Sequence, residues 1–298
     1  MALPEMLAGN LDDFLSNYYL KLPYARQGVT RDLSELGTWQ VLERALSSPD
    51  VDLLVVRQGC PSASSVVPDL AAARQLFHDG YTLVVRHAEC TNAGLAKLAA
   101  AFAGELAGEV EIHLYLTPAT QFGFSWHYDA EDVFILQTHG VKQYELRKNT
   151  VHPWPLVETL PVDMHYEREQ MPLLRSTLAA GDWLYIPAGY WHRAQAIEDS
   201  ISLAVGVCST AAVEILDFVR ARLVQSLLWR RRLPPLGSLT GGLGSLTAGD
   251  ASDDWTAKLC EELAADFARQ VVNPQIMREF IRQKQAKHAV APENRIPT

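Results

Sequence analysis

The chain has 298 residues, 48% of them hydrophobic, which accommodates one large domain, or one domain with an appendage, around a sizeable core. Its formal net charge of −9 at pH 7 argues against a broad nucleic-acid-binding surface, so no nucleic-acid partner is expected. Its four cysteines form no Cys-x-x-Cys pair, which gives no support to a zinc ribbon or a thioredoxin-type motif.

Residues 1–109 predict a mixed α/β flank that packs on a β core. The first 15 residues contain no basic stretch followed by an apolar run, so no secretory signal is expected. No stretch of about 18 apolar residues predicts a membrane span, and we therefore expect a cytoplasmic protein without a membrane partner. Hydrophobic periodicity predicts helices over 10–20, 68–80 and 91–106, the last with Thr91 as its N-cap, and strands over 51–56 and 81–86.

Residues 110–208 form the predicted β core, because short apolar segments separated by Gly, Pro and Asn are typical of an antiparallel sandwich or barrel. Residues 209–298 predict a helical region. Its helices are expected over 211–231 and 253–272, with a flexible linker at 234–250 between them and a polar, mobile tail from Gln283. The two helices are too apolar to stand alone in water, so we expect them to pack on the core or on a second copy of the chain.

A histidine and a carboxylate stand two residues apart in an otherwise apolar stretch, at His127 and Asp129. On a strand, residues i and i+2 project from the same face. A second histidine, His192, follows a Gly-Asp turn, a strand over 183–186 and a Pro-Ala-Gly turn. Two imidazoles and one carboxylate on one face are typical of non-haem Fe(II) oxygenases. The alternative is a surface His–Asp pair beside an unrelated core histidine.

Lys142 lies on the more apolar face of the strand predicted over 141–147, together with Tyr144 and Leu146. An inward lysine requires an anion, because an unpaired buried charge is costly. One carboxylate of a small dianionic co-substrate such as 2-oxoglutarate fits this requirement. The alternative is a lysine that reaches solvent at the rim of the barrel.

The strand predicted over 111–118 has one apolar and one polar face. Its polar face carries His113, Tyr115 and Thr117, and could line a polar lumen or face solvent.

The segments LYLTPATQFGFSWHYDAEDVFILQTHGVKQYEL and GDWLYIPAGYWHRA resemble the JmjC oxygenases of the cupin superfamily, most closely the ribosomal-oxygenase (cupin-4) type. The resemblance covers about 110–207. It implies a mainly β fold with helical flanks, in which a double-stranded β-helix (jelly-roll) core is followed by the C-terminal helical region. It also implies a homodimer, formed through those helices.

The resemblance further implies a site for Fe(II), 2-oxoglutarate and O2. The iron ligands would be His127, Asp129 and His192, and the distal carboxylate of 2-oxoglutarate would contact Lys142 and the hydroxyl of Tyr115. Members of the group often have Asn where this chain has His113, so we also assign His113 to the co-substrate contacts. No general base is needed for C–H abstraction, and none is assigned. Four aromatic side chains would form walls of the substrate entrance or belong to the barrel core, namely Phe124, Trp126, Tyr128 and Trp191.

The function expected from this resemblance is hydroxylation of an amino-acid side chain in a protein or peptide, with succinate and CO2 as co-products. A ribosomal protein or a ribosomally made peptide leads as substrate, ahead of a free small molecule, and N-demethylation stays open. One alternative is a cupin-type isomerase or hydrolase that uses no 2-oxoglutarate, which leaves Lys142 unexplained. Another is a non-catalytic binding module, which leaves the complete ligand set unexplained.

Overall fold

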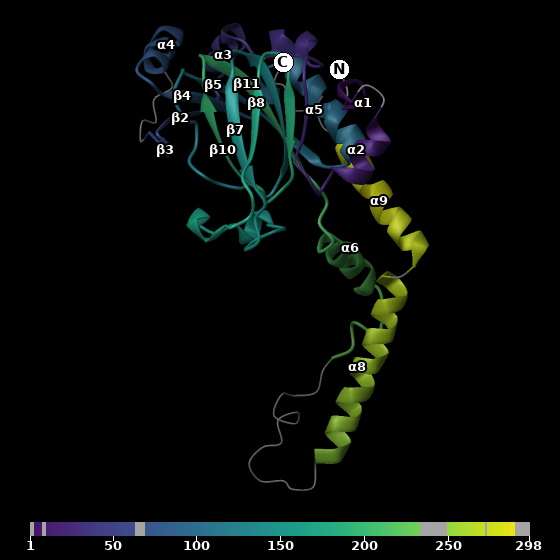
Figure 1. Cartoon of the computed structure of the whole chain (residues 1–298). Coiled ribbons are helices and arrows are strands. Elements are labelled where there is room, and N and C mark those ends of the chain that lie inside the picture. Colours follow the sequence, from purple (N-terminus) through teal and green to yellow (C-terminus); the bar gives the residue numbers. More distant parts are fainter. Residues whose placement is uncertain (1–2, 8–9, 63–68, 233–248, 272, 290–298) are drawn as a thin grey trace. The chain divides into compact units, whose positions relative to one another are not determined.

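The computed structural model describes residues 3–7, 10–62, 69–232, 249–271 and 273–289. The chain divides into two compact units (Figure 1). The first comprises Met1–Ser209 with Lys287–Thr298, and the second comprises Thr210–Ala286.

The first unit is built on two antiparallel sheets. The larger has the strand order β1-β9-β6-β11-β5-β4-β2-β3, and the smaller has the order β10-β7-β8. The strands are β1 (Tyr24–Arg26), β2 (Asp52–Arg57), β3 (Cys60–Pro61), β4 (Thr82–Arg86), β5 (Glu109–Thr117), β6 (Asp132–His139), β7 (Lys142–Arg147), β8 (Leu174–Leu178), β9 (Trp183–Ile186), β10 (Trp191–Ala196) and β11 (Ser200–Cys208). The helices of this unit are α1 (Leu3–Met6), α2 (Leu11–Asn17), α3 (Trp39–Leu46), α4 (Leu70–His78) and α5 (Ala93–Leu106), with short 3-10 turns at Arg31–Leu36, Ala88–Cys90, Val157–Thr159 and Tyr166–Arg168.

Helices and the two sheets form three layers with two apolar interfaces (Figure 1). Strand β5 illustrates the two interfaces, because its apolar and polar side chains alternate and so point to opposite faces of the sheet. Ile112, Leu114 and Leu116 are fully buried in the larger cluster, which also holds Leu95 and Phe102 of α5. The smaller cluster joins residues of both sheets, among them Ile135, Tyr144, Leu184 and Ala204. The predicted double-stranded β-helix with helical flanks is confirmed, and its interior lies between the sheets.

The N-terminal strands extend the same large sheet. Strand β4 pairs antiparallel with β5, and β2 pairs with β4. The expected strands over 51–56 and 81–86 are therefore confirmed within one residue, and they form one edge of the sheet beside the predicted core.

Side-chain N-caps begin helices α4 and α5. Asp69 accepts a hydrogen bond from the backbone amide of Ala72 (2.8 Å) at the start of α4. At α5 the N-cap is Asn92, whose Oδ1 accepts from the amides of Gly94 and Leu95, so the choice of Thr91 was wrong. The Thr91 hydroxyl instead donates to the carbonyl of Ala88 (3.0 Å) in the preceding 3-10 turn.

The second unit consists of helices α6 (Glu214–Leu223), α8 (Gly249–Val271) and α9 (Pro274–Ala289). The helix expected over 211–231 is wrong in extent, since regular helix ends at Leu223 and turns follow, one with its Ser226 hydroxyl accepting from the amide of Leu228. The tail expected from Gln283 is also wrong as far as residue 289, because α9 continues there and buries Phe280. Of the expected linker, 234–248 lies outside the described residues and 249–250 belongs to α8.

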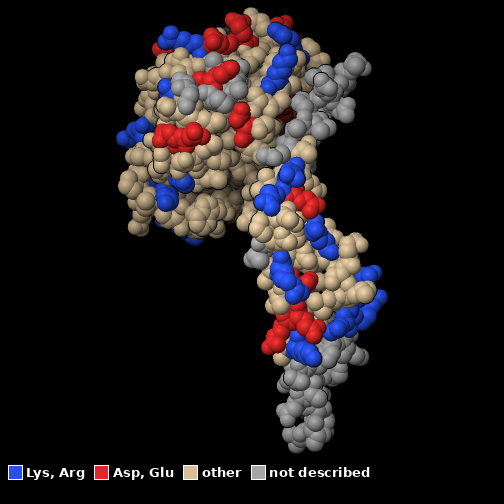
Figure 2. Space-filling model, turned by 90° about the vertical axis from the view of Figure 1, so that its right-hand side faces the viewer, with Lys and Arg blue, Asp and Glu red and all other residues tan. Residues whose placement is uncertain are grey.

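Basic and acidic side chains intermingle along the second unit on the face shown in Figure 2. Arg222 pairs with Glu279 (2.7 Å), and Lys284 pairs with Glu214. Within the described part of the chain, no helix has the length and apolar character needed to cross a membrane.

Candidate metal centre

Three side chains with metal-ligand atoms converge in the first unit. One ligand atom each from His127, Asp129 and His192 lies within 4.8 Å of the other two. His127 and His192 form an isolated antiparallel bridge, with the amide of His192 donating to the carbonyl of His127 (2.8 Å) and the reverse bond at 3.2 Å. The expected strand under His127 and Asp129 is therefore wrong, but this bridge still brings the two histidines together.

Hydrogen bonds orient both imidazoles. Nδ1 of His127 lies 2.8 Å from the carbonyl of Ser125, and Nδ1 of His192 lies 3.0 Å from the carbonyl of Tyr190. An Nδ1–H that donates to a carbonyl leaves the Nε2 lone pair free for a metal ion. Burial, and then the neighbouring His127, lower the pKa of His192 to about 4, so this imidazole is neutral at pH 7.

A glycine turn holds Asp129 beside His192. The amide of Gly189 donates to the carbonyl of Asp129 (2.8 Å). Gly189 has φ +80°, and a Cβ there would meet Pro155 Cδ at 2.8 Å. The Asp129 carboxylate then lies 3.5 Å from Nε2 of His192. Two imidazoles and one carboxylate suit Fe(II), and fit the donor set of a facial triad.

The three donors face a cavity of about 300 Å³ between the two sheets. Its lining draws on both sheets, with Lys142, Tyr144 and Ala194 from the smaller sheet and Tyr115, Ile135 and Ala204 from the larger one. The cavity is thus the interior of the double-stranded β-helix.

Lys142 points into this cavity and is only 3% exposed, so the prediction of an inward lysine is confirmed and a rim lysine is excluded. Its ammonium lies 3.4 Å from the Ser202 hydroxyl and 5.4 Å from the centroid of the Tyr115 ring. No carboxylate of the described residues pairs with it. Burial lowers the pKa of Lys142 to about 7, which marks an ammonium group that has no anion.

The turn before Lys142 fixes which face of β7 is buried. Gly140 has φ +64°, and a Cβ there would lie 2.0 Å from the carbonyl oxygen of Asp199. With this turn in place, β7 alternates buried and half-buried residues, and Lys142, Tyr144 and Leu146 face inward.

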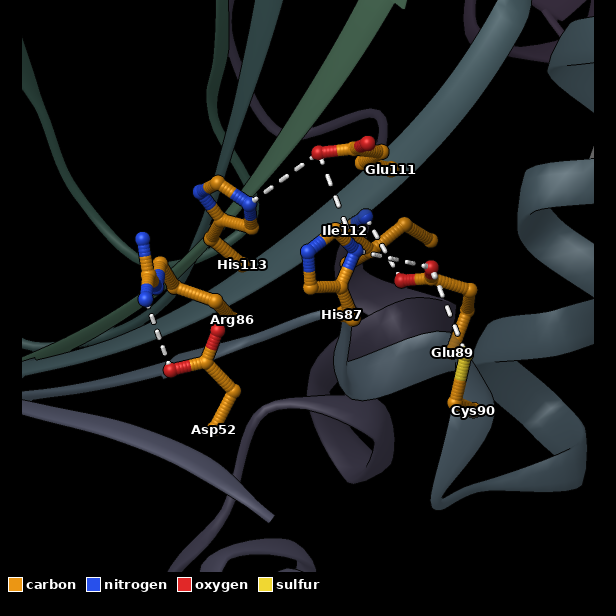
Figure 3. Close-up of polar contacts among 8 residues, drawn as sticks. All are labelled: Asp52, Arg86, His87, Glu89, Cys90, Glu111, Ile112 and His113. Atoms are coloured by element: carbon orange, nitrogen blue, oxygen red, sulfur yellow. Dashed lines mark hydrogen bonds and ion pairs between the residues drawn. The ribbon is translucent and has the colours of Figure 1, made fainter. Parts of the chain in front are cut away.

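Tyr115 and His113 both line the cavity from β5, as expected for a polar lumen. Burial, followed by the Asp129 charge, raises the pKa of Tyr115, which keeps its phenol protonated as a hydrogen-bond donor. His113 has Glu111 as its nearest charged partner, with Nε2 3.7 Å from the carboxylate (Figure 3). A contact between His113 and the co-substrate stays a prediction.

Two of the four predicted aromatic side chains border open space. Phe124 lines the metal cavity, and both Phe124 and Trp126 line an adjoining open groove of about 560 Å³ that also reaches His127. Trp126 stacks on Tyr166, with ring centroids 3.9 Å apart.

The other two aromatic side chains, Tyr128 and Trp191, are 1% and 2% exposed. Their rings pack edge to face with centroids 4.7 Å apart, and neither residue lines the metal cavity. Their assignment to the substrate entrance is corrected for this reason: the two rings pack on each other, Trp191 also packs on Tyr166, and Tyr128 also packs on His152.

Two neighbouring carboxylates were missed by sequence reasoning. Asp132 is fully buried and accepts hydrogen bonds from Tyr185 (2.6 Å), Ser209 (2.7 Å) and the amide of Ala188 (3.2 Å). Glu131 instead lines the metal cavity, and burial, then the charge of Asp129, raise its pKa to about 7. One sequence signal could have separated the two residues. Consecutive side chains of an extended segment point to opposite faces, so Glu131 and Asp132 could be expected to face different sides.

Comparison with known proteins agrees with this geometry. The family model for the JmjC domain matches residues 89–215. A Dictyostelium discoideum protein named bifunctional lysine-specific demethylase and histidyl-hydroxylase NO66 is 34% identical over 135 residues, 44% of this chain and 26% of that protein. Human ribosomal oxygenase 1 is 30% identical over 139 residues, 44% of this chain and 21% of that protein. The chain spans about a quarter of the length of the curated relatives it matches.

Solved structures share the fold. Escherichia coli YcfD, a ribosomal oxygenase in complex with cobalt and 2-oxoglutarate, aligns with a TM-score of 0.55 and 17% identity over 93% of this chain and 70% of that chain. Its complex with cobalt and succinic acid aligns with a TM-score of 0.53 and 19% identity, over 91% and 70%. At this identity the likeness concerns the fold, which is the jelly-roll with helical flanks.

Proposed function

We propose, from the JmjC domain that residues 89–215 form, that this chain is an Fe(II)- and 2-oxoglutarate-dependent oxygenase that hydroxylates an amino-acid side chain of a protein or peptide. The observation that carries the proposal is a single cavity with a donor set at one place and an unpaired cation at another. His127, Asp129 and His192 supply the donors, and buried Lys142 supplies the cation.

The chain's own residues do three things in this reaction. His127, Asp129 and His192 would hold Fe(II) on one face, with each imidazole fixed by its Nδ1 hydrogen bond. Lys142, whose ammonium lies 3.4 Å from the Ser202 hydroxyl and 5.4 Å from the centroid of the Tyr115 ring, would hold the distal carboxylate of 2-oxoglutarate together with the Tyr115 hydroxyl. Bound iron with 2-oxoglutarate and O2 supplies the oxidation of an unactivated C–H bond, with succinate and CO2 as co-products.

The protein also positions the substrate and excludes water from the site. Apolar side chains such as Val133, Ile135 and Ala204 line the same cavity and limit the water that reaches the reacting atoms. The open groove beside His127 gives a polypeptide access to the cavity. A cupin-type isomerase or hydrolase would bind no dianionic co-substrate, so buried Lys142 would have no anion to pair with. This alternative is therefore disfavoured.

The relatives' names favour a polypeptide substrate, and a ribosomal protein leads. N-demethylation would use the same site, since it proceeds through hydroxylation of an N-methyl group.

The test is mass spectrometry of lysate polypeptides incubated with the protein, Fe(II) and 2-oxoglutarate. We expect a mass gain of one oxygen atom on a polypeptide, together with succinate release. Loss of a methyl group would indicate demethylation, and succinate release without any modified polypeptide would favour a small-molecule substrate.

We further propose that the second unit forms a homodimer. Its helices and turns expose large apolar side chains that a single copy leaves in water, namely Val213, Leu216, Val224, Leu227 and Ile281. We expect light scattering to give twice the monomer mass. A monomer mass over a wide concentration range would contradict this proposal.

A further inference from the structure

One turn of the chain, residues 187–190, supports the candidate metal ligands, and we call it the ligand turn. The amide of Gly189 donates to the carbonyl of Asp129 (2.8 Å). Nδ1 of His192 lies 3.0 Å from the carbonyl of Tyr190, and the backbone bridge at His192 extends this support to the other histidine. The position of the ligand turn therefore sets where the three donors meet.

Asp132 anchors the ligand turn from the start of β6. Its Oδ1 accepts a hydrogen bond from the amide of Ala188 (3.2 Å), inside the turn. The carboxylate is fully buried and also accepts from the hydroxyls of Tyr185 (2.6 Å) and Ser209 (2.7 Å). Moving a buried carboxylate with several hydrogen bonds is costly, because each donor would lose its partner. Asp132 therefore fixes this part of the turn to the sheet.

The segment that follows α2 anchors the same turn at its end. The Tyr190 hydroxyl donates to the carbonyl of Lys21 (3.2 Å), and Tyr190 is buried. One residue before Lys21, the amide of Leu20 donates to the hydroxyl of Tyr185 (2.8 Å), which itself donates to Asp132. This short segment thus reaches the ligand turn both directly and through Asp132.

The backbone of Leu20 shows that these bonds hold the segment. Leu20 has φ +60°, a left-handed conformation that bulky side chains rarely adopt and that persists where the surroundings fix it. Its side chain is exposed, so side-chain packing does not account for the conformation. Tyr19 adds a further contact, with its hydroxyl 2.7 Å from that of Ser209. Hydrogen bonds to the Asp132 network and to Tyr190 therefore keep this backbone in place.

We propose that Asp132 and Tyr190 are positioning residues for the iron, which set the relative placement of its three ligands by fixing the ligand turn. This inference rests on the proposed function. Neither residue lines the metal cavity, so both act through the ligands. Groups that orient metal ligands typically change metal affinity about 10–100-fold when they are mutated. The alternative is a network that stabilises the fold and leaves iron affinity unaffected.

Four variants separate these two roles. Asp132→Ala removes the acceptor for the amide of Ala188, and Tyr190→Phe removes only the hydroxyl that reaches Lys21. Asp132→Asn keeps one acceptor oxygen for the turn, because its amide nitrogen can face the Ser209 hydroxyl, which accepts as well as donates. Ser209→Ala is the matched control, since it removes a hydrogen bond to the same carboxylate and leaves the bond from Ala188.

Fe(II) is titrated anaerobically into each metal-free protein, at a temperature at which its melting curve shows it folded. We expect the affinity to fall about 10–100-fold in Asp132→Ala and about 2–10-fold in Tyr190→Phe, with Asp132→Asn closer to wild type. Ser209→Ala should lower the melting temperature and keep wild-type iron affinity. At saturating Fe(II) the KM for 2-oxoglutarate should stay near wild type in all four, because Lys142 lies outside this network.

Unchanged iron affinity in Tyr190→Phe, or in folded Asp132→Ala, would overturn the inference and leave the oxygenase in place. If Asp132→Ala does not fold, Tyr190→Phe decides the question alone. An equal loss of affinity in Ser209→Ala and Asp132→Ala would also overturn it, because affinity would then follow stability. Absence of a tight iron site in wild type would overturn the proposed function, and this inference with it.

Discussion

Asp129→Ala should lose tight Fe(II) binding, and with it succinate release. The carboxylate is the anionic member of the donor set and lies 3.5 Å from Nε2 of His192. Without it, two imidazoles remain, and the donor set has no carboxylate to offset part of the metal charge. Mutation of a residue that only orients a metal ligand typically lowers metal affinity about 10–100-fold. Loss of a ligand itself should therefore lower Fe(II) affinity by more than about 100-fold.

Anaerobic titration of metal-free protein with Fe(II) measures this directly, and wild type should show one tight site. Asp163→Ala is the matched control, because Asp163 is an exposed carboxylate that lines the adjoining groove. We expect wild-type iron binding in that control. Undiminished iron binding in Asp129→Ala would refute the assignment of the metal centre.

Lys142→Ala should raise the KM for 2-oxoglutarate while Fe(II) binding stays near wild type. Lys142 is 3% exposed, and among the described residues only the Ser202 hydroxyl lies within hydrogen-bond distance of its ammonium. Removing one member of a buried charge pair costs about 2–5 kcal/mol, or about 30-fold or more in affinity. Lys142→Arg should keep part of the activity, because the charge survives although its geometry changes.

Succinate release measured against 2-oxoglutarate concentration tests this prediction. Lys148→Ala is the matched control, since Lys148 is an exposed lysine just past the end of the same strand. An unchanged KM in Lys142→Ala would move the assignment toward a metalloenzyme that uses no 2-oxoglutarate.

The same lysine predicts how the stability of the ligand-free protein depends on pH. Its pKa is lowered from 10.5 to about 7, so between these values the unfolded chain binds a proton that the folded chain does not. The contribution of Lys142 to the free energy of unfolding should therefore rise with pH across this window, and its destabilising effect should be greatest below pH 7. Lys142→Met should raise the melting temperature of the ligand-free protein most at low pH. Above pH 7, 2-oxoglutarate binding should take up protons, because the anion restores the ammonium.

The sequence by itself determined the fold class, the three candidate ligands and the inward lysine. His127 and Asp129 could be paired because a two-residue spacing puts side chains on one side of an extended chain, a local rule that held even without a regular strand. Lys142 could be placed inward because its strand alternates apolar and polar residues. The pairing of His127 with Asp129 and the orientation of Lys142 need only neighbours in sequence. The fold class and the choice of His192 came from the resemblance to the JmjC oxygenases and from the turn and strand signals before His192.

Only the tertiary structure decided which residues from distant segments meet. Alternation gives the face of a strand, but not the strand that lies beside it or the register between them. Glu131 and Gly206 are a loop residue and a strand residue far apart in sequence, and the pairing of β11 with β5 and β6 brings them together. Tyr128 and Trp191 likewise became packing residues because the bridge between His127 and His192 sets their rings against each other. Long-range register therefore decided that the Glu131 carboxyl lies over Gly206 in the cavity, for which no local pattern exists.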